Sequence, residues 1–131
     1  MKLVIEKPVT VITPTIGSDK LKDAIESVKN QTYKCKHLLV VDGVEHARNV
    51  PAPNGTDLQI CYTPENTGGN GFYGHRIYAA FTHLVNSKYV LYLDQDNWLE
   101  REHVHRCVSL IERHELEWCY SLRNIYSKES Q

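Results

Sequence analysis

Residues 88–97 read KYVLYLDQDN, an apolar run that ends in a cluster of acids and amides. Its first half, residues 89–93, is a short apolar run of β-forming residues, which is typical of a buried strand. Asp94, Gln95 and Asp96 follow directly at the end of that strand. In open α/β sheets, ligands bind in the crevice outside the carboxyl ends of the strands. Two carboxylates spaced two residues apart at such a place can share a hard cation such as Mg²⁺, and plain turn chemistry is the alternative interpretation.

The rest of the chain alternates between predicted strands and predicted helices. Apolar runs and helical spacing of apolar residues predict strands at residues 9–13, 38–41, 58–62, 89–93 and 118–122, and helices at residues 20–30, 76–85 and 100–114. Strands joined by helices imply a parallel sheet that is covered on both faces. We therefore expect an α/β protein with three layers, α/β/α, around a mostly parallel central sheet, organised as a single domain over residues 1–131.

The composition is that of an ordinary soluble globular protein. The 131 residues are 41% hydrophobic and 24% charged, which suits one packed domain. A net charge of −1 without a basic run argues against nucleic-acid binding. No stretch reaches the ~20 apolar residues that a transmembrane helix needs, and the N-terminus lacks the apolar core of a signal peptide. Four cysteines without a CxxC pair indicate reduced thiols in a cytoplasmic protein.

Polar side chains recur where the predicted strands end. Thr13, Pro14 and Thr15 close the first strand, Asp42 closes the second, and residues 94–96 follow the strand described above. If these strands are neighbours, the groups converge on one crevice, because the carboxyl ends of parallel strands share an edge of the sheet. A carboxylate there can accept a hydrogen bond from a nucleobase N–H or a ribose hydroxyl. A turn aspartate before glycine and plain strand-end propensity are the alternatives.

A glycine-rich turn, PENTGGNGFYG, occupies residues 64–74 and precedes a predicted helix. Three of its glycines match GxGxxG literally, which is the fingerprint of dinucleotide-binding folds. The context is poor for that fingerprint, because residues 64–68 separate the strand from the first of these glycines. Flexible glycines ahead of a helix still allow the backbone to approach a phosphate closely. Arg76, in the first turn of the helix, can supply a bidentate phosphate contact, with a solvated arginine as the alternative.

No other motif indicates a different chemistry. The seven histidines show no metal-ligand spacing, so they are interpreted as surface or internally satisfied polar residues. No serine lies in a GxSxG elbow, and no cysteine has a neighbour that marks it as a nucleophile. The strand ends therefore remain the candidate site.

Three segments carry a family resemblance when they are taken together. They are VTVITPTIGSDKLKDAIESVKNQTY at residues 9–33, HLLVVDG at residues 37–43 and YVLYLDQDN at residues 89–97. The first resembles the opening strand, Thr-Pro-Thr turn and Gln-Thr-Tyr signature of the nucleotide-sugar glycosyltransferases of family 2, which have the GT-A fold. The second resembles that family's strand ending in a nucleotide-binding aspartate. The third resembles its DxD-type metal motif.

The resemblance implies a role for each matching residue. The implied nucleotide-binding residues are Thr13, Pro14, Thr15, Asp42, Arg76, Asp94 and Gln95, and the implied metal-binding residues are Asp94 and Asp96. Asp42 would hydrogen-bond the base, and Arg76 would lie near the nucleotide or diphosphate. Asp94 would face the ribose or the metal, and Asp96 would ligate a Mg²⁺ or Mn²⁺ ion on the diphosphate. The cation would stabilise the departing nucleoside diphosphate as charge develops on it.

Two features depart from the family pattern. Gly43, Val44 and Glu45 follow Asp42, whereas the family usually continues with a second acid and a serine or threonine. In the family, the acceptor-binding half and the catalytic base lie beyond the last strand found here, and this sequence ends at Gln131. The chain therefore resembles a short form without the acceptor half, and no residue is assigned as the catalytic base.

We therefore expect a metal-dependent glycosyltransferase that uses a UDP- or GDP-type sugar donor. Two alternatives stay open, a nucleotide-sugar-binding module without catalysis and a nicotinamide-dinucleotide-binding unit of an oxidoreductase. The sugar, the base, the acceptor and the oligomeric state are not specified by the sequence, and a homo-oligomer is one option.

Overall fold

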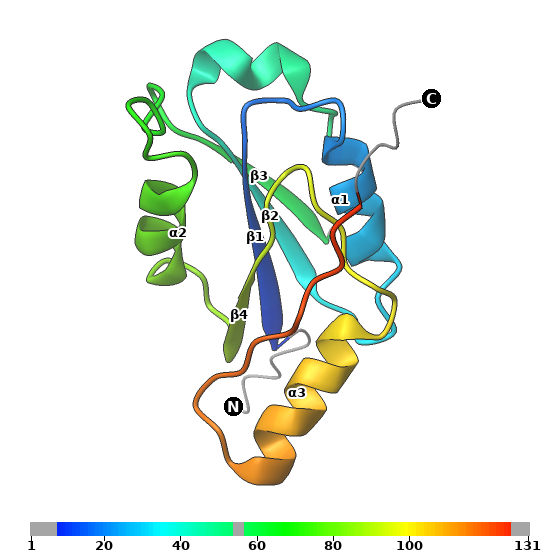
Figure 1. Ribbon diagram of the computed structural model, residues 1–131. Helices are drawn as coiled ribbons and strands as arrows, with labels where there is room; N and C mark the ends of the chain where they lie inside the picture. Colours follow the sequence, from blue (N-terminus) through cyan, green and yellow to red (C-terminus); the bar gives the residue numbers. More distant parts are fainter. Residues whose placement is uncertain (1–7, 54–56, 127–131) are drawn as a thin grey trace.

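The computed structural model describes residues 8–53 and 57–126. Its centre is a four-stranded parallel sheet in the order β3-β2-β1-β4 (Figure 1). The strands are β1 (Val9–Thr15), β2 (Lys36–Val41), β3 (Leu58–Tyr62) and β4 (Tyr89–Tyr92). Every residue of β1 and all of β2 after its first residue are buried. This is expected for central strands of a parallel sheet that is covered on both faces.

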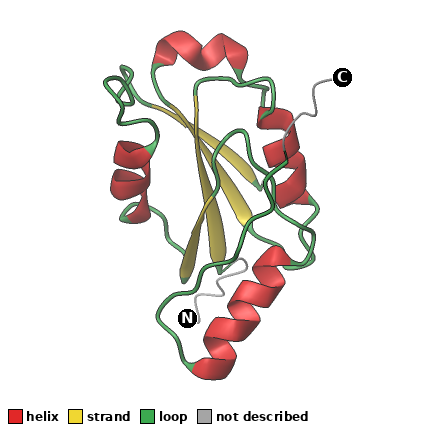
Figure 2. Cartoon of the chain, viewed as in Figure 1, coloured by secondary structure: helices red, strands yellow, loops and turns green. Residues whose placement is uncertain are grey.

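The helices form the two outer layers. They are α1 (Leu21–Lys29), α2 (His75–Thr82), α3 (His103–His114) and the short 3₁₀ helix η1 (Val44–Asn49). Val11 of β1 packs in one core cluster with residues of α1 and α3, whereas its neighbour Ile12 packs in a second cluster with Ile77 of α2. Successive strand residues point to opposite faces, so α1 and α3 cover one face and α2 covers the other (Figure 2). The predicted three-layer α/β/α fold with a parallel sheet is confirmed.

The prediction of a strand at residues 118–122 is wrong. After α3, Glu115 adopts a left-handed conformation with φ of 52°, and residues 116–126 continue as neither helix nor strand. In Figure 1 they run back from the far end of α3 toward α1. Trp118, Tyr120 and Leu122 are 70%, 77% and 92% exposed. β-Forming residues become a strand only when they pair with a neighbouring strand, and local sequence does not reveal that pairing.

Gln31 joins the end of α1 to the start of α3. Its side chain is fully buried, and its amide nitrogen donates to the carbonyl oxygens of Ser27 at 3.0 Å and Glu100 at 2.8 Å. Its amide oxygen accepts from the backbone N–H of Val104 at 3.0 Å. Buried amides are tolerated when donor and acceptor are both satisfied in this way. Gln31 of the Gln-Thr-Tyr signature is therefore a structural connector between two helices on one face of the sheet.

Gln31→Leu should destabilise the fold. The substitution keeps a similar volume but removes the partner of the Val104 N–H and one of the two donors to the Glu100 carbonyl, and the loss should be roughly 2–4 kcal/mol in the free energy of unfolding. Urea unfolding followed by circular dichroism measures this change. Asn30→Ala is the matched control, because the side chain of that exposed neighbour bonds only to the Glu26 side chain in the described structure. Equal stability of both variants would contradict the connector role.

The described helices are also too short or too polar to cross a bilayer. Within residues 8–53 and 57–126, none combines the length and the apolar character that a membrane span requires.

Candidate functional site

The ends of β1, β2 and β4 lie at one edge of the sheet. Thr15 of β1 pairs with Val41 of β2, and the next residue, Asp42, donates its backbone N–H to the Thr15 carbonyl at 2.9 Å. On the other side of β1, Leu93 donates to the Ile12 carbonyl at 3.1 Å as β4 ends. Thr15, Asp42 and residues 94–96 therefore lie at the carboxyl edge of the same sheet.

Gln95 ties the turn after β4 to the turn after β1. Its side-chain oxygen accepts hydrogen bonds from the Thr15 hydroxyl at 2.8 Å, the Ile16 N–H at 3.1 Å and the Ser18 N–H at 3.3 Å. The Thr15 hydroxyl oxygen in turn accepts from the Gly17 N–H at 2.9 Å. The structure thus brings Thr15 and Gln95 together, and their contacts hold the two turns in a fixed relation. Direct contact of either residue with a nucleotide stays a prediction.

Asp94 and Asp96 are exposed in the turn after β4. One carboxylate oxygen of Asp94, Oδ1, accepts a hydrogen bond of 2.8 Å from the hydroxyl of Tyr78 on α2. Burial first, then this bond and the negative charges of Asp94 and Asp96, raise the pKa of Tyr78 far above its usual value. The phenol therefore stays protonated and remains a donor. Tyr78 thus connects α2 to the acidic turn through Asp94.

The acidic turn opens onto a hollow beside β4. Asp96 and Trp98 line this hollow, which continues along β4 to α3 and to residues 117–126. The Trp98 ring packs against the Tyr126 ring with centroids 5.2 Å apart. Segment 117–126 thus borders the same hollow as Asp96.

Asp42 holds the glycine-rich turn against the end of β2. Its carboxylate accepts hydrogen bonds from the Thr67 N–H at 2.7 Å, the Thr67 hydroxyl at 2.9 Å, the Gly68 N–H at 2.8 Å and the Asn66 side-chain amide at 3.4 Å. The residue is only 4% exposed. A Cβ on Gly68 would lie 2.9 Å from Asp42 Oδ2 and would also meet the Tyr73 carbonyl, so the close approach requires glycine. Hydrogen bonding of Asp42 to a base stays a prediction.

Arg76 lies on the same turn. Its guanidinium donates to the Thr67 carbonyl at 3.2 Å and lies 3.5 Å above the centre of the Phe72 ring. A cation over an aromatic face is held by the ring quadrupole, so the exposed arginine has a defined place next to the turn that binds Asp42. The remaining guanidinium donors can meet a phosphate. The sequence reading missed Phe72 and Tyr78, because their contacts come from the fold of the turn and of α2.

Thr13 and Pro14 lie inside the fold. Thr13 is fully buried, and its hydroxyl is hydrogen-bonded to His37 Nε2 at 2.9 Å. Pro14 packs where α2 begins, since a Cβ on Gly74 would come within 2.7 Å of its ring. Thr13 and Pro14 are two of the three residues expected to line the pocket, and they lie within the sheet beneath the site. A direct nucleotide contact by them stays a prediction.

His37 should make stability depend on pH. Burial lowers the pKa of His37 from 6.5 to about 4, so the folded protein keeps it neutral while the unfolded chain takes up a proton below pH 6.5. The free energy of unfolding should therefore fall as the pH drops from 6.5 to 4, by roughly 3 kcal/mol from this group. Urea unfolding of the parent and of His37→Gln at several pH values measures it, and the variant should lose this part of the pH dependence. Identical slopes would contradict the assignment.

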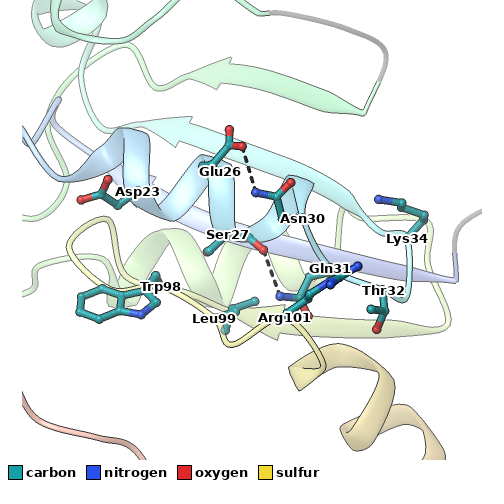
Figure 3. Close-up of a pocket in the computed structure, with 10 residues that line it drawn as sticks. All are labelled: Asp23, Glu26, Ser27, Asn30, Gln31, Thr32, Lys34, Trp98, Leu99 and Arg101. Atoms are coloured by element: carbon teal, nitrogen blue, oxygen red, sulfur yellow. Dashed lines mark hydrogen bonds between the residues drawn. The ribbon is translucent and has the colours of Figure 1, made fainter.

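A second groove lies beside α1, away from Asp42 and the glycine-rich turn. Figure 3 shows its lining, which comes from α1, the residues after it, and residues 98–101. Glu26 there accepts a hydrogen bond from the Asn30 amide at 2.9 Å, and the amide of Gln31 is bonded to backbone. Acidic and basic side chains are mixed along it, and its central polar groups already satisfy one another. The strand ends therefore remain the better candidate.

The donor set at the strand ends fits a hard divalent cation that is shared with a substrate. Among the described residues, no group of three or more His, Cys, Asp or Glu side chains could hold a metal ion by itself. Mg²⁺ and related ions, however, are commonly bound by one or two carboxylates together with substrate phosphates. In the described structure Asp94 has one oxygen outside the Tyr78 bond, and no described side chain bonds the Asp96 carboxylate. The pair can therefore act as a partial coordination shell.

Comparisons with known proteins agree with this geometry. The model of the family described as Glycosyl transferase family 2 matches residues 10–130. A crystal structure of S. aureus TarS 1-349 is similar in fold, with a TM-score of 0.65 and 20% identity over 82% of this chain and 33% of that chain. A second crystal structure of S. aureus TarS has a TM-score of 0.61 and 18% identity over 82% of this chain and 20% of that chain. A search of curated proteins finds no match.

This chain thus spans about a third or less of the length of the TarS chains. At these identities the TarS structures establish the GT-A type of α/β fold and not a substrate. The family model covers nearly all of the sequence, which confirms the predicted membership. The chain belongs to glycosyl transferase family 2.

Proposed function

We propose that this domain binds a nucleoside-diphosphate sugar together with Mg²⁺ or Mn²⁺ and acts in glycosyl transfer. The observation that carries the proposal is the pair of exposed carboxylates, Asp94 and Asp96, at the carboxyl end of β4 in a member of glycosyl transferase family 2. Family membership also favours glycosyl transfer over the nicotinamide alternative. A UDP- or GDP-type donor is proposed, and the acceptor is left open.

The exposed groups are proposed to contact the donor directly. Asp94 and Asp96 would hold the cation, which when bound supplies positive charge next to the diphosphate leaving group. Arg76 would meet the nucleotide or the diphosphate with its free guanidinium donors. Gln95 and Thr15 would keep the acidic turn at a fixed height above β1 through the hydroxyl-to-amide bond described above. Preorganised charge of this kind stabilises a leaving group without reorganisation during the reaction.

The buried groups are proposed to act through the elements that they hold. A carboxylate has about four acceptor positions, and four donors of Asn66, Thr67 and Gly68 already occupy that of Asp42. A nucleobase N–H would therefore have to displace one of them. We infer that Asp42 shapes the nucleotide site chiefly by fixing residues 66–68, and that Thr13 and Pro14 support the edge of the sheet from within.

A cytoplasmic location is proposed from the cysteines. No disulfide joins the four cysteines, all of which lie within the described residues, and reducing compartments preserve thiols in that state.

Calorimetric titration tests the proposed function. The protein is titrated with UDP, GDP and their sugar conjugates, each with and without Mn²⁺. We expect at least one nucleoside diphosphate to bind tightly only in the presence of Mn²⁺. Binding with turnover in an acceptor panel supports the transferase, and binding without turnover supports the non-catalytic module. Failure of every nucleotide to bind, with Mn²⁺ or without it, would refute the proposal.

A further inference from the structure

We infer that Tyr78 is a positioning residue for the proposed metal ligand Asp94. Its hydroxyl donates a hydrogen bond to Oδ1 of the carboxylate and so fixes the orientation of the Asp94 side chain. The other oxygen, Oδ2, is left for the cation. The inference rests on the proposed function, because it concerns how the cation site is prepared. It goes further by assigning a role to a residue on α2, a helix separate from the acidic turn.

The phenol ring of Tyr78 is held firmly on several sides. The ring packs against the core cluster that includes Ile77, and it lies 4.8 Å from the Tyr92 ring, at an angle of 53°. A Cβ on Gly74 would lie 3.6 Å from the ring, which shows that the turn before α2 also borders it. A hydroxyl on such a ring has little freedom. It therefore delivers its 2.8 Å hydrogen bond to Asp94 Oδ1 from a fixed point.

The two carboxylates of the pair differ in this respect. Asp94 is anchored by Tyr78, whereas no side chain in residues 8–53 or 57–126 donates to Asp96. Carboxylates that bind metal are usually oriented by outer hydrogen bonds, and removing such a partner typically lowers metal affinity by about 10–100-fold. An exposed aspartate without an anchor must lose rotamer freedom on binding. Asp94 is thus the ligand whose orientation is fixed before the cation binds, and Asp96 is the ligand whose side chain reorients on binding.

Tyr78→Phe tests the inference, because it removes a single oxygen and keeps the ring. We expect Mn²⁺-dependent binding of UDP or GDP, measured by calorimetry, to weaken by about tenfold or more. Binding of the same nucleotide without Mn²⁺ should change less than twofold. Electron paramagnetic resonance titration with Mn²⁺ gives a second readout that does not depend on turnover.

Tyr92→Phe is the matched control. Tyr92 belongs to the same ring pair, but its hydroxyl bonds to the Thr82 hydroxyl at 2.6 Å and not to an acid. Its loss should leave Mn²⁺-dependent binding within twofold of the parent. If both tyrosine variants weakened nucleotide binding equally with and without Mn²⁺, Tyr78 would have only a packing role and the inference would be overturned.

A double-mutant cycle with Asp94→Ala separates action through Asp94 from action elsewhere. In the Asp94→Ala background, Tyr78→Phe should have no further effect on Mn²⁺ binding, because the partner of the hydroxyl is gone. A full additional loss would overturn the inference. If nucleotide binding depended on Mn²⁺ equally in the parent and in Tyr78→Phe, the inference about Tyr78 would be overturned and the proposed function would stand. Absence of Mn²⁺-dependent binding in the parent would overturn the proposed function and this inference with it.

Discussion

Asp96→Ala should lower Mn²⁺-dependent binding of UDP or GDP by roughly 100-fold or more, since even the loss of an outer partner of a metal ligand costs about 10–100-fold. The side chain is exposed in the turn after β4 and makes no hydrogen bond within the described residues. Its removal should therefore leave the free energy of unfolding within about 0.5 kcal/mol of the parent. Calorimetry with and without Mn²⁺ and urea unfolding measure the two quantities.

The control for this prediction is Glu100→Ala. Glu100 is another exposed acid on the segment after β4, and within the described residues only its backbone carbonyl is hydrogen-bonded, to the Gln31 amide and to the His103 N–H. Its substitution should leave Mn²⁺-dependent nucleotide binding within twofold of the parent, because the general negative charge of the region is not what binds the cation. If Asp96→Ala bound UDP or GDP with Mn²⁺ as the parent does, the assignment of Asp96 as a metal ligand would be wrong.

Asp42→Ala is expected to disrupt the glycine-rich turn. The substitution leaves the N–H groups of Thr67 and Gly68 without the carboxylate that now binds both. Hydrogen bonds to a charged group contribute about 1.5–3 kcal/mol each, so we expect a loss of roughly 3–5 kcal/mol in the free energy of unfolding. Arg76 is tied to the same turn through the Thr67 carbonyl, so nucleotide binding should weaken more than the binding of free Mn²⁺.

Glu65→Ala supplies the comparison for Asp42→Ala. Glu65 lies exposed in the same turn, and within the described residues its side chain makes no hydrogen bond, whereas its backbone carbonyl accepts from the Thr63 hydroxyl at 2.9 Å. We expect a change of less than about 0.5 kcal/mol in stability. If Asp42→Ala weakened nucleotide and free Mn²⁺ equally, or left stability unchanged, the carboxylate would not act by holding the turn.

Much of the fold could be predicted from the sequence because its signals are local. Strands β1, β2 and β4 are short apolar runs, and α1 and α3 carry apolar residues at helical spacing, so each element reports its own type. Their alternation implies a parallel sheet, and parallel strands bring their carboxyl ends to one edge. The same reasoning failed at residues 118–122, where β-forming residues found no place in the sheet.

The candidate site was predictable only in part. The acidic turn at Asp94 and Asp96 and the contact between Thr15 and Gln95 follow from where the strands end. The partners of Asp42 lie 25 and 26 residues further along the chain, and the partner of Asp94 is a tyrosine 16 residues before it. No periodicity in the sequence reports contacts between separate elements. Thr13 was expected at the site because it lies near the end of a strand, but its hydroxyl points inward and bonds to His37.

Apolar spacing and strand-end residues are properties of short segments. They were therefore enough to predict the class of fold and the edge of the sheet where polar groups gather, and they carry the resemblance to family 2. Only the tertiary structure decided which carboxylates stay free. Packing of α2 and the glycine-rich turn against the sheet supplies donors to Asp42 and to one oxygen of Asp94. Those donors are distant in the chain, and hydrogen bonds form only between groups that the completed core brings within about 3 Å.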